Sequence, residues 1–210
     1  MIRRIWIGAV LALALPLAAS PAAAAPVWAA LGIAGGVQQP DGHLADYQWS
    51  TTPHGAFGAA ARVGMGRWSA GLDGWTTTAT QRLDATTAST VRSTRIELVT
   101  EARLTSLAGV DLFASLGAGR LHLGYDPDRV TIDTGGGATT VDLASISTWV
   151  GGGGLGLRRA LAAGWLAGLA VDHRIYALDT AHREGGSIVE RRETFGDWSA
   201  RFELTRRFTR

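Results

Sequence analysis

Eight segments in which apolar and polar side chains alternate limit what this chain can fold into. A period of two is typical of a β-strand with one apolar and one polar face. Long polar stretches and short links follow these segments in strict alternation, which leaves both ends of the chain on the side of the short links. The segments lie near 27–37, 56–66, 68–76, 94–104, 110–121, 143–157, 165–176 and 196–209; the long stretches lie near 38–55, 77–92, 125–140 and 178–193.

This order predicts an all-β fold, an eight-stranded antiparallel up-and-down barrel that crosses a membrane over residues 26–210. Transmembrane barrels of bacteria have an even number of strands, tight turns on the periplasmic side and longer loops outside the cell. The alternative is a soluble eight-stranded barrel with its apolar face inside. A soluble barrel needs a charged exterior, whereas the polar face of several segments is mainly Gly, Ala, Ser and Thr.

Residues 1–25 are predicted to be a signal peptide rather than part of the fold. Arg3 and Arg4 give a positive start, 5–19 form an apolar run, and the alanines at 22–25 form a small-residue cleavage site. A membrane helix of about 20 apolar residues is the competing interpretation, but prolines interrupt this run. Export and a membrane barrel together predict a location in the bacterial outer membrane.

Composition excludes several classes of function. Without Arg3 and Arg4 the chain has 18 basic and 18 acidic residues, so it lacks the basic excess of a nucleic-acid-binding protein. It has no cysteine, and therefore neither a disulfide framework nor a thiolate metal site. We expect no cofactor.

The last segment predicts which face meets lipid. Phe202 and Leu204 share one face, whereas Arg201 and Glu203 share the other. A shift of one residue would exchange the faces, and an arginine at the bilayer midplane costs about 2–4 kcal/mol. The charged face must therefore point inward.

An eight-stranded barrel has an interior just wide enough for side chains to fill it. Since buried charges need partners, we expect an ion-pair plug, with Asp111 beside Arg103, Asp172 beside Arg201, and Glu97 within reach of Arg201. A narrow channel or gate and catalysis in the lumen are the alternatives. The charges expected in the lumen are Arg62, Asp73, Arg95, Glu97, Glu101, Arg103, Asp111, Asp172, Arg174, Arg201 and Glu203.

Aromatic residues near the strand ends predict two girdles at the membrane surfaces. One girdle would lie at the ends with short links and the other at the ends with long loops. The first consists of Trp68, Trp165 and Phe208; the second consists of Trp75, Tyr125 and Tyr176.

Motifs for catalysis or ligand binding are weak. The glycines at 151–154 lack the Lys-Ser/Thr of a phosphate loop, so we interpret them as small residues that let a strand bend. Asp172 precedes His173, but adjacent strand residues point to opposite faces. A calcium site from Asp126, Asp128 and Asp133 is possible in principle, but a solvated acidic loop is the better interpretation.

The signal peptide, the eight segments, the loop alternation and the aromatic last segment resemble the OmpA/OmpX superfamily of small outer-membrane barrels. The resemblance implies recognition by the barrel-assembly machinery through the end of the chain, although Thr209 and Arg210 follow the final aromatic residue. Lipid A deacylases are similar in size, but His173 is followed by Arg174 and Ile175 rather than by their His-x-Ser motif. The residues of the assembly signal would be Trp198, Phe202, Leu204 and Phe208.

The sequence thus predicts a monomeric, non-enzymatic surface barrel with a plugged lumen and loops that contact lipopolysaccharide or other ligands. The alternatives are a narrow pore for ions or small solutes and a hydrolase that modifies lipid A.

Overall fold

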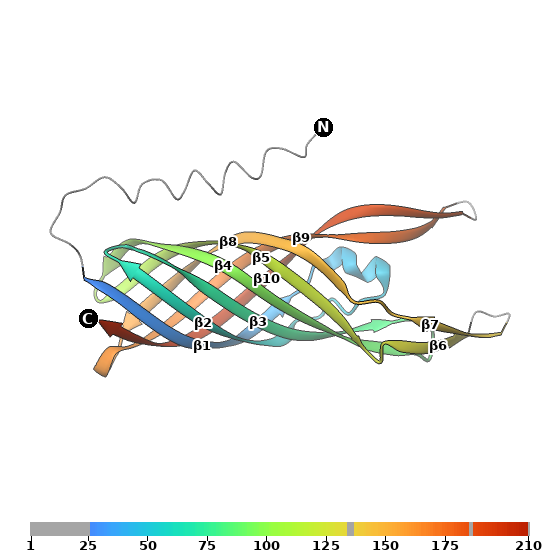
Figure 1. Cartoon of the computed structure of the whole chain (residues 1–210), viewed down its shortest axis with the longest axis horizontal. Coiled ribbons are helices and arrows are strands. Elements are labelled where there is room, and N and C mark those ends of the chain that lie inside the picture. The colour runs from blue at the N-terminus through green and yellow to red at the C-terminus, as the bar shows by residue number, and fades with distance from the viewer. Residues whose placement is uncertain (1–25, 134–136, 185–186, 210) are drawn as a thin grey trace, which may run out of the picture.

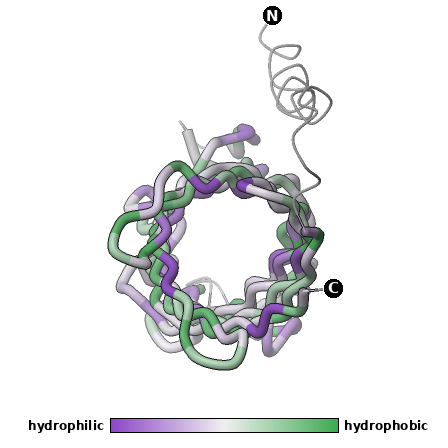
Figure 2. Tube along the Cα trace, turned by 90° about the vertical axis from the view of Figure 1, so that its left-hand side faces the viewer, coloured by the Kyte–Doolittle hydropathy of each residue, from purple (hydrophilic) through white to green (hydrophobic). Residues whose placement is uncertain are grey.

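Eight antiparallel strands close into a ring, which Figures 1 and 2 show from the side and end-on. The computed structural model describes residues 26–133, 137–184 and 187–209, so the predicted signal peptide lies outside the described residues. The order around the ring is β1-β10-β9-β8-β5-β4-β3-β2, closed by pairing of β1 with β10. This confirms the predicted eight-stranded barrel. The strands of the ring are β1 (Val27–Gln39), β2 (His54–Met65), β3 (Trp68–Arg82), β4 (Ala88–Leu107), β5 (Val110–Asp126), β8 (Ile146–Ala160), β9 (Trp165–Glu184) and β10 (Ser187–Thr209).

Three short turns lie at the end of the barrel where β1 begins and β10 ends (Figure 1). Between β4 and β5, Ala108 and Gly109 have φ angles of 50° and 78°, as a two-residue type I′ hairpin turn requires. The 3₁₀ turn η3 (Ala162–Gly164) joins β8 to β9. The short links therefore lie on one side, as predicted.

The long connections contain more strand than the sequence pattern indicated. The stretches near 77–92 and 178–193 are mostly continuations of paired strands, and the hairpin of β6 (Arg129–Asp133) and β7 (Ala138–Asp142) lies within the stretch near 125–140. Beyond the membrane both faces of a strand meet water, so the apolar alternation disappears while backbone pairing continues. These hairpins project from the right-hand end of the barrel in Figure 1.

The apolar face of the sheet points outward. Leu31, Ile33, Leu98, Leu155 and Leu169 are between 58% and 67% exposed, which is opposite to the soluble-barrel alternative. An apolar stretch of about ten residues at ~3.3 Å each, tilted by ~40°, gives a band about 25 Å tall. No helix within the described residues is long and apolar enough to cross a membrane.

Candidate functional site: the barrel interior and its outer mouth

Ten charged side chains form one connected set in the interior, which we call the lumen network. It contains equal numbers of arginines and carboxylates, so its formal charges balance. Its members come from all strands of the ring except β1 and β5. They are Arg62, Asp73, Arg95, Glu97, Glu101, Arg158, Asp172, Arg174, Arg201 and Glu203.

Arg201 on β10 is the centre of the network. Its Nε lies 3.1 Å from Asp172 Oδ2 and 3.1 Å from Glu203 Oε1, and its Nη1 lies 3.3 Å from Asp73 Oδ2. Asp73 also pairs with Arg62. The sequence predicted the contact between Asp172 and Arg201.

Glu97 takes partners other than the one expected. The sequence predicted that it could reach Arg201, but its carboxylate lies 2.8 Å from Arg95 Nε and 2.8 Å from Arg174 Nε. Arg174 reaches Glu97 across the interior from β9, whereas Arg201 on β10 is already paired with Asp73, Asp172 and Glu203. This prediction was wrong.

Arg158 is a member of the network that sequence analysis missed. It donates from Nη1 to Glu101 Oε2 at 3.1 Å and from Nη2 to Glu203 Oε2 at 3.3 Å. Its guanidinium carbon lies 4.4 Å from the ring centroid of Phe113. The sequence placed Arg158 in a short link because the apolar alternation ends at residue 157, but β8 continues to Ala160.

Arg103 and Asp111 lie at the end of the lumen beside the short turns rather than in its interior. Arg103 Nη1 is 3.8 Å from Asp111 Oδ2, as expected, but the two side chains are 47% and 37% exposed. The register of β4 and β5 also shifts here, between Arg103 and Thr105. This pair is therefore not part of the buried network.

The opposite end of the interior holds an apolar cluster, which we call the mouth cluster. The 3₁₀ helix η2 (Gly42–Tyr47), from the β1–β2 connection, folds toward this end in Figure 1, and Leu44 is only 3% exposed. The sequence predicted this connection to be a polar loop, and nothing in its pattern indicated that it turns inward. The buried members are Leu44, Val91, Leu121, Leu123, Val150, Tyr176, Leu178 and Phe195.

Polar bonds fix η2 in the mouth. Asp41 Oδ2 accepts from the backbone N–H of Gly196 at 2.7 Å, and Oδ1 accepts from the backbone N–H of His43 at 3.0 Å. Although burial raises the pKa of Asp41, these hydrogen bonds outweigh it and hold the pKa below the ordinary 3.8. Tyr47 Oη donates to Glu193 Oε2 at 2.6 Å, so β10 holds both ends of the turn.

The aromatic prediction for the long-loop end was wrong. Trp75 and Tyr176 are 6% and 7% exposed and point into the lumen, and Tyr125 packs on the mouth cluster. Trp75 lies two positions from Asp73 on the same strand, so both side chains point to the same face. The inward direction of Asp73 therefore already predicted an inward Trp75. The aromatic side chains that do face outward near this end are Phe57, Trp149 and Trp198, at 70%, 68% and 54% exposed.

At the short-turn end, Trp165 and Phe208 face outward at 37% and 50% exposed, and Trp68 is partly buried. On β10, Trp198, Phe202 and Phe208 are each about half exposed. Their role as an assembly signal remains a prediction.

The geometry gives little support to catalysis or metal binding. Asp172 points into the lumen, whereas the ring of His173 lies 4.6 Å from that of Trp198 on β10. In the part of the chain that the structure describes, no group of three or more His, Asp or Glu side chains is placed to hold a metal ion.

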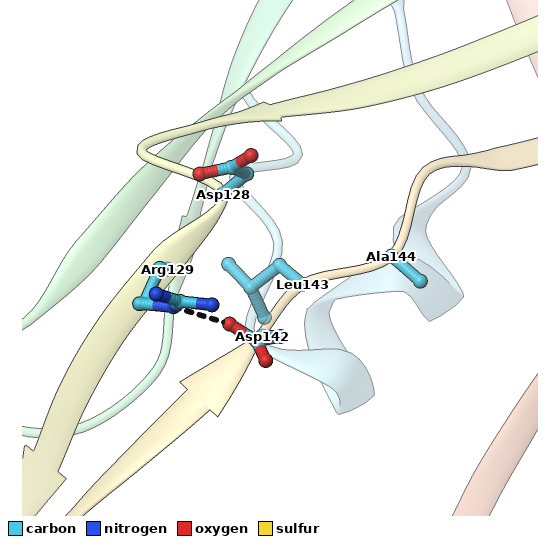
Figure 3. Close-up of a pocket in the computed structure, with 5 residues that line it drawn as sticks. All are labelled: Asp128, Arg129, Asp142, Leu143 and Ala144. Carbon is cyan, nitrogen blue, oxygen red and sulfur yellow. Dashed lines mark hydrogen bonds and ion pairs between the residues drawn. The ribbon is translucent and has the colours of Figure 1, made fainter.

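A hollow of about 620 Å³ lies at the base of the β6–β7 hairpin. Figure 3 shows the five residues that line it. Arg129 Nε donates to Asp142 Oδ1 across it at 2.6 Å, and both side chains are more than 70% exposed. The hollow is open to solvent and its arginine already has a carboxylate partner, so it does not form a preorganised ligand-binding site. In the lumen, a cavity beside Arg62, Arg158 and Glu203 has a volume of about 10 Å³, room for at most one water.

The ring resembles solved outer-membrane proteins. Neisserial surface protein A aligns with 89% of this chain and all of its own, with a TM-score of 0.51 and 10% identity. The chain has the fold of the small outer-membrane β-barrels. This confirms the fold that the OmpA/OmpX resemblance implied, and with the apolar exterior it places the barrel in the bacterial outer membrane.

Other solved structures match this barrel less closely. Outer membrane protein W of Escherichia coli has a TM-score of 0.48 and 18% identity over 88% of this chain and 98% of its own. The E. coli outer-membrane protease OmpT has a TM-score of 0.40 and 9% identity over 89% of this chain and 99% of its own. No family model and no curated protein matches the barrel.

Proposed function

We propose that this barrel is a non-enzymatic surface protein with a non-conducting lumen, and that its outer hairpins bind ligands. The observation that carries the proposal is that side chains fill the interior at two successive levels. The lumen network fills the level toward the short turns, and the mouth cluster fills the level toward the hairpins.

The two levels oppose conduction for different reasons. An ion in the lumen network would have to separate buried pairs such as Arg174 and Glu97, and each charge left without a partner is costly. The mouth cluster offers an ion no polar groups to replace its water, and burying an unpaired charge among apolar side chains is costly. The narrow-pore alternative would require both levels to rearrange.

The hairpins favour a binding role because functional residues concentrate on connections that a rigid scaffold carries. The β9–β10 ribbon continues beyond the ring to Glu184 and Ser187, and β6 and β7 form a separate hairpin. The hydrolase alternative has no support from His173, which packs on Trp198.

Planar-bilayer recordings test this proposal. The refolded barrel should give no steady single-channel openings, and a variant with residues 42–47 replaced by glycine and serine should remain closed at the lumen network. Steady, charge-selective openings of the unaltered barrel would overturn the proposal. Channel openings seen only in the variant would show that η2 acts as a gate. That result would contradict the proposal that the lumen is permanently closed. Incubation with lipopolysaccharide, followed by mass spectrometry, should release no acyl chains.

A further inference from the structure

The apolar band ends in a group of cations on the outer face of β4, β5 and β8, on the side of the long hairpins. The strand register orders them in rows. Arg120 pairs with Ile96 and Trp149 in the row nearest the band, and His122 occupies the next row beside Ser147. Arg92, opposite Gly124, lies in the third row.

The side chains of Arg120 and His122 point away from the hydrocarbon. Arg120 lies over the ring of Trp149, 5.0 Å from its centroid, and its Nη2 donates to Ser147 Oγ at 2.9 Å. Nε2 of His122 lies 3.9 Å from the point where a side chain on Gly124 would begin. The basic groups of Arg120 and His122 therefore lie toward the hairpins, in the direction of Arg92.

These arginines differ from others on the surface because they lack carboxylate partners. Arg129 and Arg192 have exposed ion pairs with Asp142 and Asp179. Among the side chains that the structure describes, which exclude those of residues 133–136 and 182–188, neither Arg92 nor Arg120 forms an ion pair with a carboxylate. Asp126 is the next outward acidic residue on β5, one outward position beyond Gly124.

We propose that Arg92, Arg120 and His122, together with the ring of Trp149, bind a phosphate of lipopolysaccharide in the outer leaflet. Guanidinium groups bind phosphate through paired, charge-assisted hydrogen bonds. The acyl chains of the same glycolipid would lie on the apolar band directly below, where Ile96 and Leu98 are 58% and 62% exposed.

The surroundings of these residues favour a lipid phosphate over a soluble anion as the ligand. The site combines unpaired cations with an exposed tryptophan and an isoleucine at the edge of the band, so its ligand should carry both negative charge and hydrocarbon. The long hairpins fix the side as the outer one. This inference does not depend on the lumen being closed, so conductance and lipid binding can fail separately.

Native mass spectrometry of the refolded barrel in zwitterionic detergent provides the test. The probes are diphosphorylated lipid A, the same lipid A without phosphates, and phosphatidylglycerol. The test variant is Arg92→Gln/Arg120→Gln/His122→Gln. The control variant, Arg67→Gln/Arg159→Gln/Arg206→Gln, removes arginines near the opposite edge of the band.

The test variant should bind diphosphorylated lipid A roughly 20-fold more weakly, since each arginine near a charged membrane surface contributes roughly fivefold. The control variant should bind within about twofold of the unaltered barrel. Heat-dependent gel mobility shows whether each variant is folded. Arg92→Lys/Arg120→Lys should bind more tightly than the test variant because it keeps both charges, but more weakly than the unaltered barrel because it loses the paired guanidinium hydrogen bonds. If the triple variant does not fold, Arg120→Gln alone should still bind several-fold more weakly.

Three results would overturn the proposal. Equal loss in the test and control variants would indicate attraction by net charge alone. Unchanged binding in the test variant would remove these residues from the site. Equally tight, equally variant-sensitive binding of phosphatidylglycerol would show a site for any lipid phosphate, not one for lipopolysaccharide.

Discussion

Arg174 on β9 and Glu97 on β4 meet in the lumen although 77 positions separate them in sequence, with Nε 2.8 Å from Oε1. Both side chains are 1% exposed. In the ring, β8 and β5 lie between these strands, so the pair spans the interior. A buried pair is stable only if its other polar groups also have partners, and Glu97 has a second one in Arg95.

Glu97→Gln should lower the free energy of unfolding by about 3–5 kcal/mol because two buried arginines lose their common carboxylate. Urea titration of the barrel in lipid vesicles, followed by tryptophan fluorescence, measures this. Asp142→Asn breaks the exposed pair with Arg129 and should cost less than about 1 kcal/mol. Similar losses in the two variants would contradict a buried, paired role for Glu97.

Brominated lipids should distinguish inward from outward tryptophans. Trp149 is 68% exposed on the outer face at the edge of the apolar band, whereas Trp75 is 6% exposed in the lumen. Trp149→Phe should therefore remove a clear share of the fluorescence that brominated acyl chains quench, and Trp75→Phe should remove almost none. Quenching lost mainly in Trp75→Phe would reverse the assigned parity of β3.

Acid should loosen η2 from the barrel. Because the pKa of Asp41 is lower in the folded barrel than the ordinary 3.8, its ionised form stabilises the docked turn above that pH. The contribution is lost as the pH falls through the folded value. Hydrogen exchange at Gly196, corrected for the intrinsic rate, should speed up in this range.

Asp41→Asn is the matched variant for this effect, since an amide does not titrate there. It should weaken protection of the Gly196 N–H at neutral pH and abolish the acid-dependent change. An unchanged acid dependence in this variant would assign the effect to another group.

The four glycines at 151–154 offer a second matched pair. A side chain on Gly152 would meet the carbonyl oxygen of His173 and lie 3.0 Å from Arg174 Cα. On Gly151 it would lie an ordinary 3.5 Å from the carbonyl oxygen of Gly117. Gly152→Ala should thus destabilise the barrel by about 1–3 kcal/mol.

Gly151→Ala should change stability by less than about 0.5 kcal/mol. The same urea titration measures both glycine variants. Equal stability of the two would mean that neighbouring strands move apart at no cost.

The inward direction of two aromatic rings is already encoded in the sequence. Trp75 lies two positions from Asp73 and Tyr176 two positions from Arg174, so the same alternation that turned the charges inward also turns these rings inward. Position near a strand end suggested a girdle, but parity decides which face a ring occupies.

The sequence by itself determined the number of strands, the closed barrel and the inward direction of the charges. Each of these follows from a local period of two and from the cost of charge in hydrocarbon. Only the tertiary structure decided that Glu97 takes Arg174, that Arg158 joins the lumen network and that Leu44 enters the mouth. These contacts depend on the stagger between strands far apart in sequence, which a local pattern does not encode.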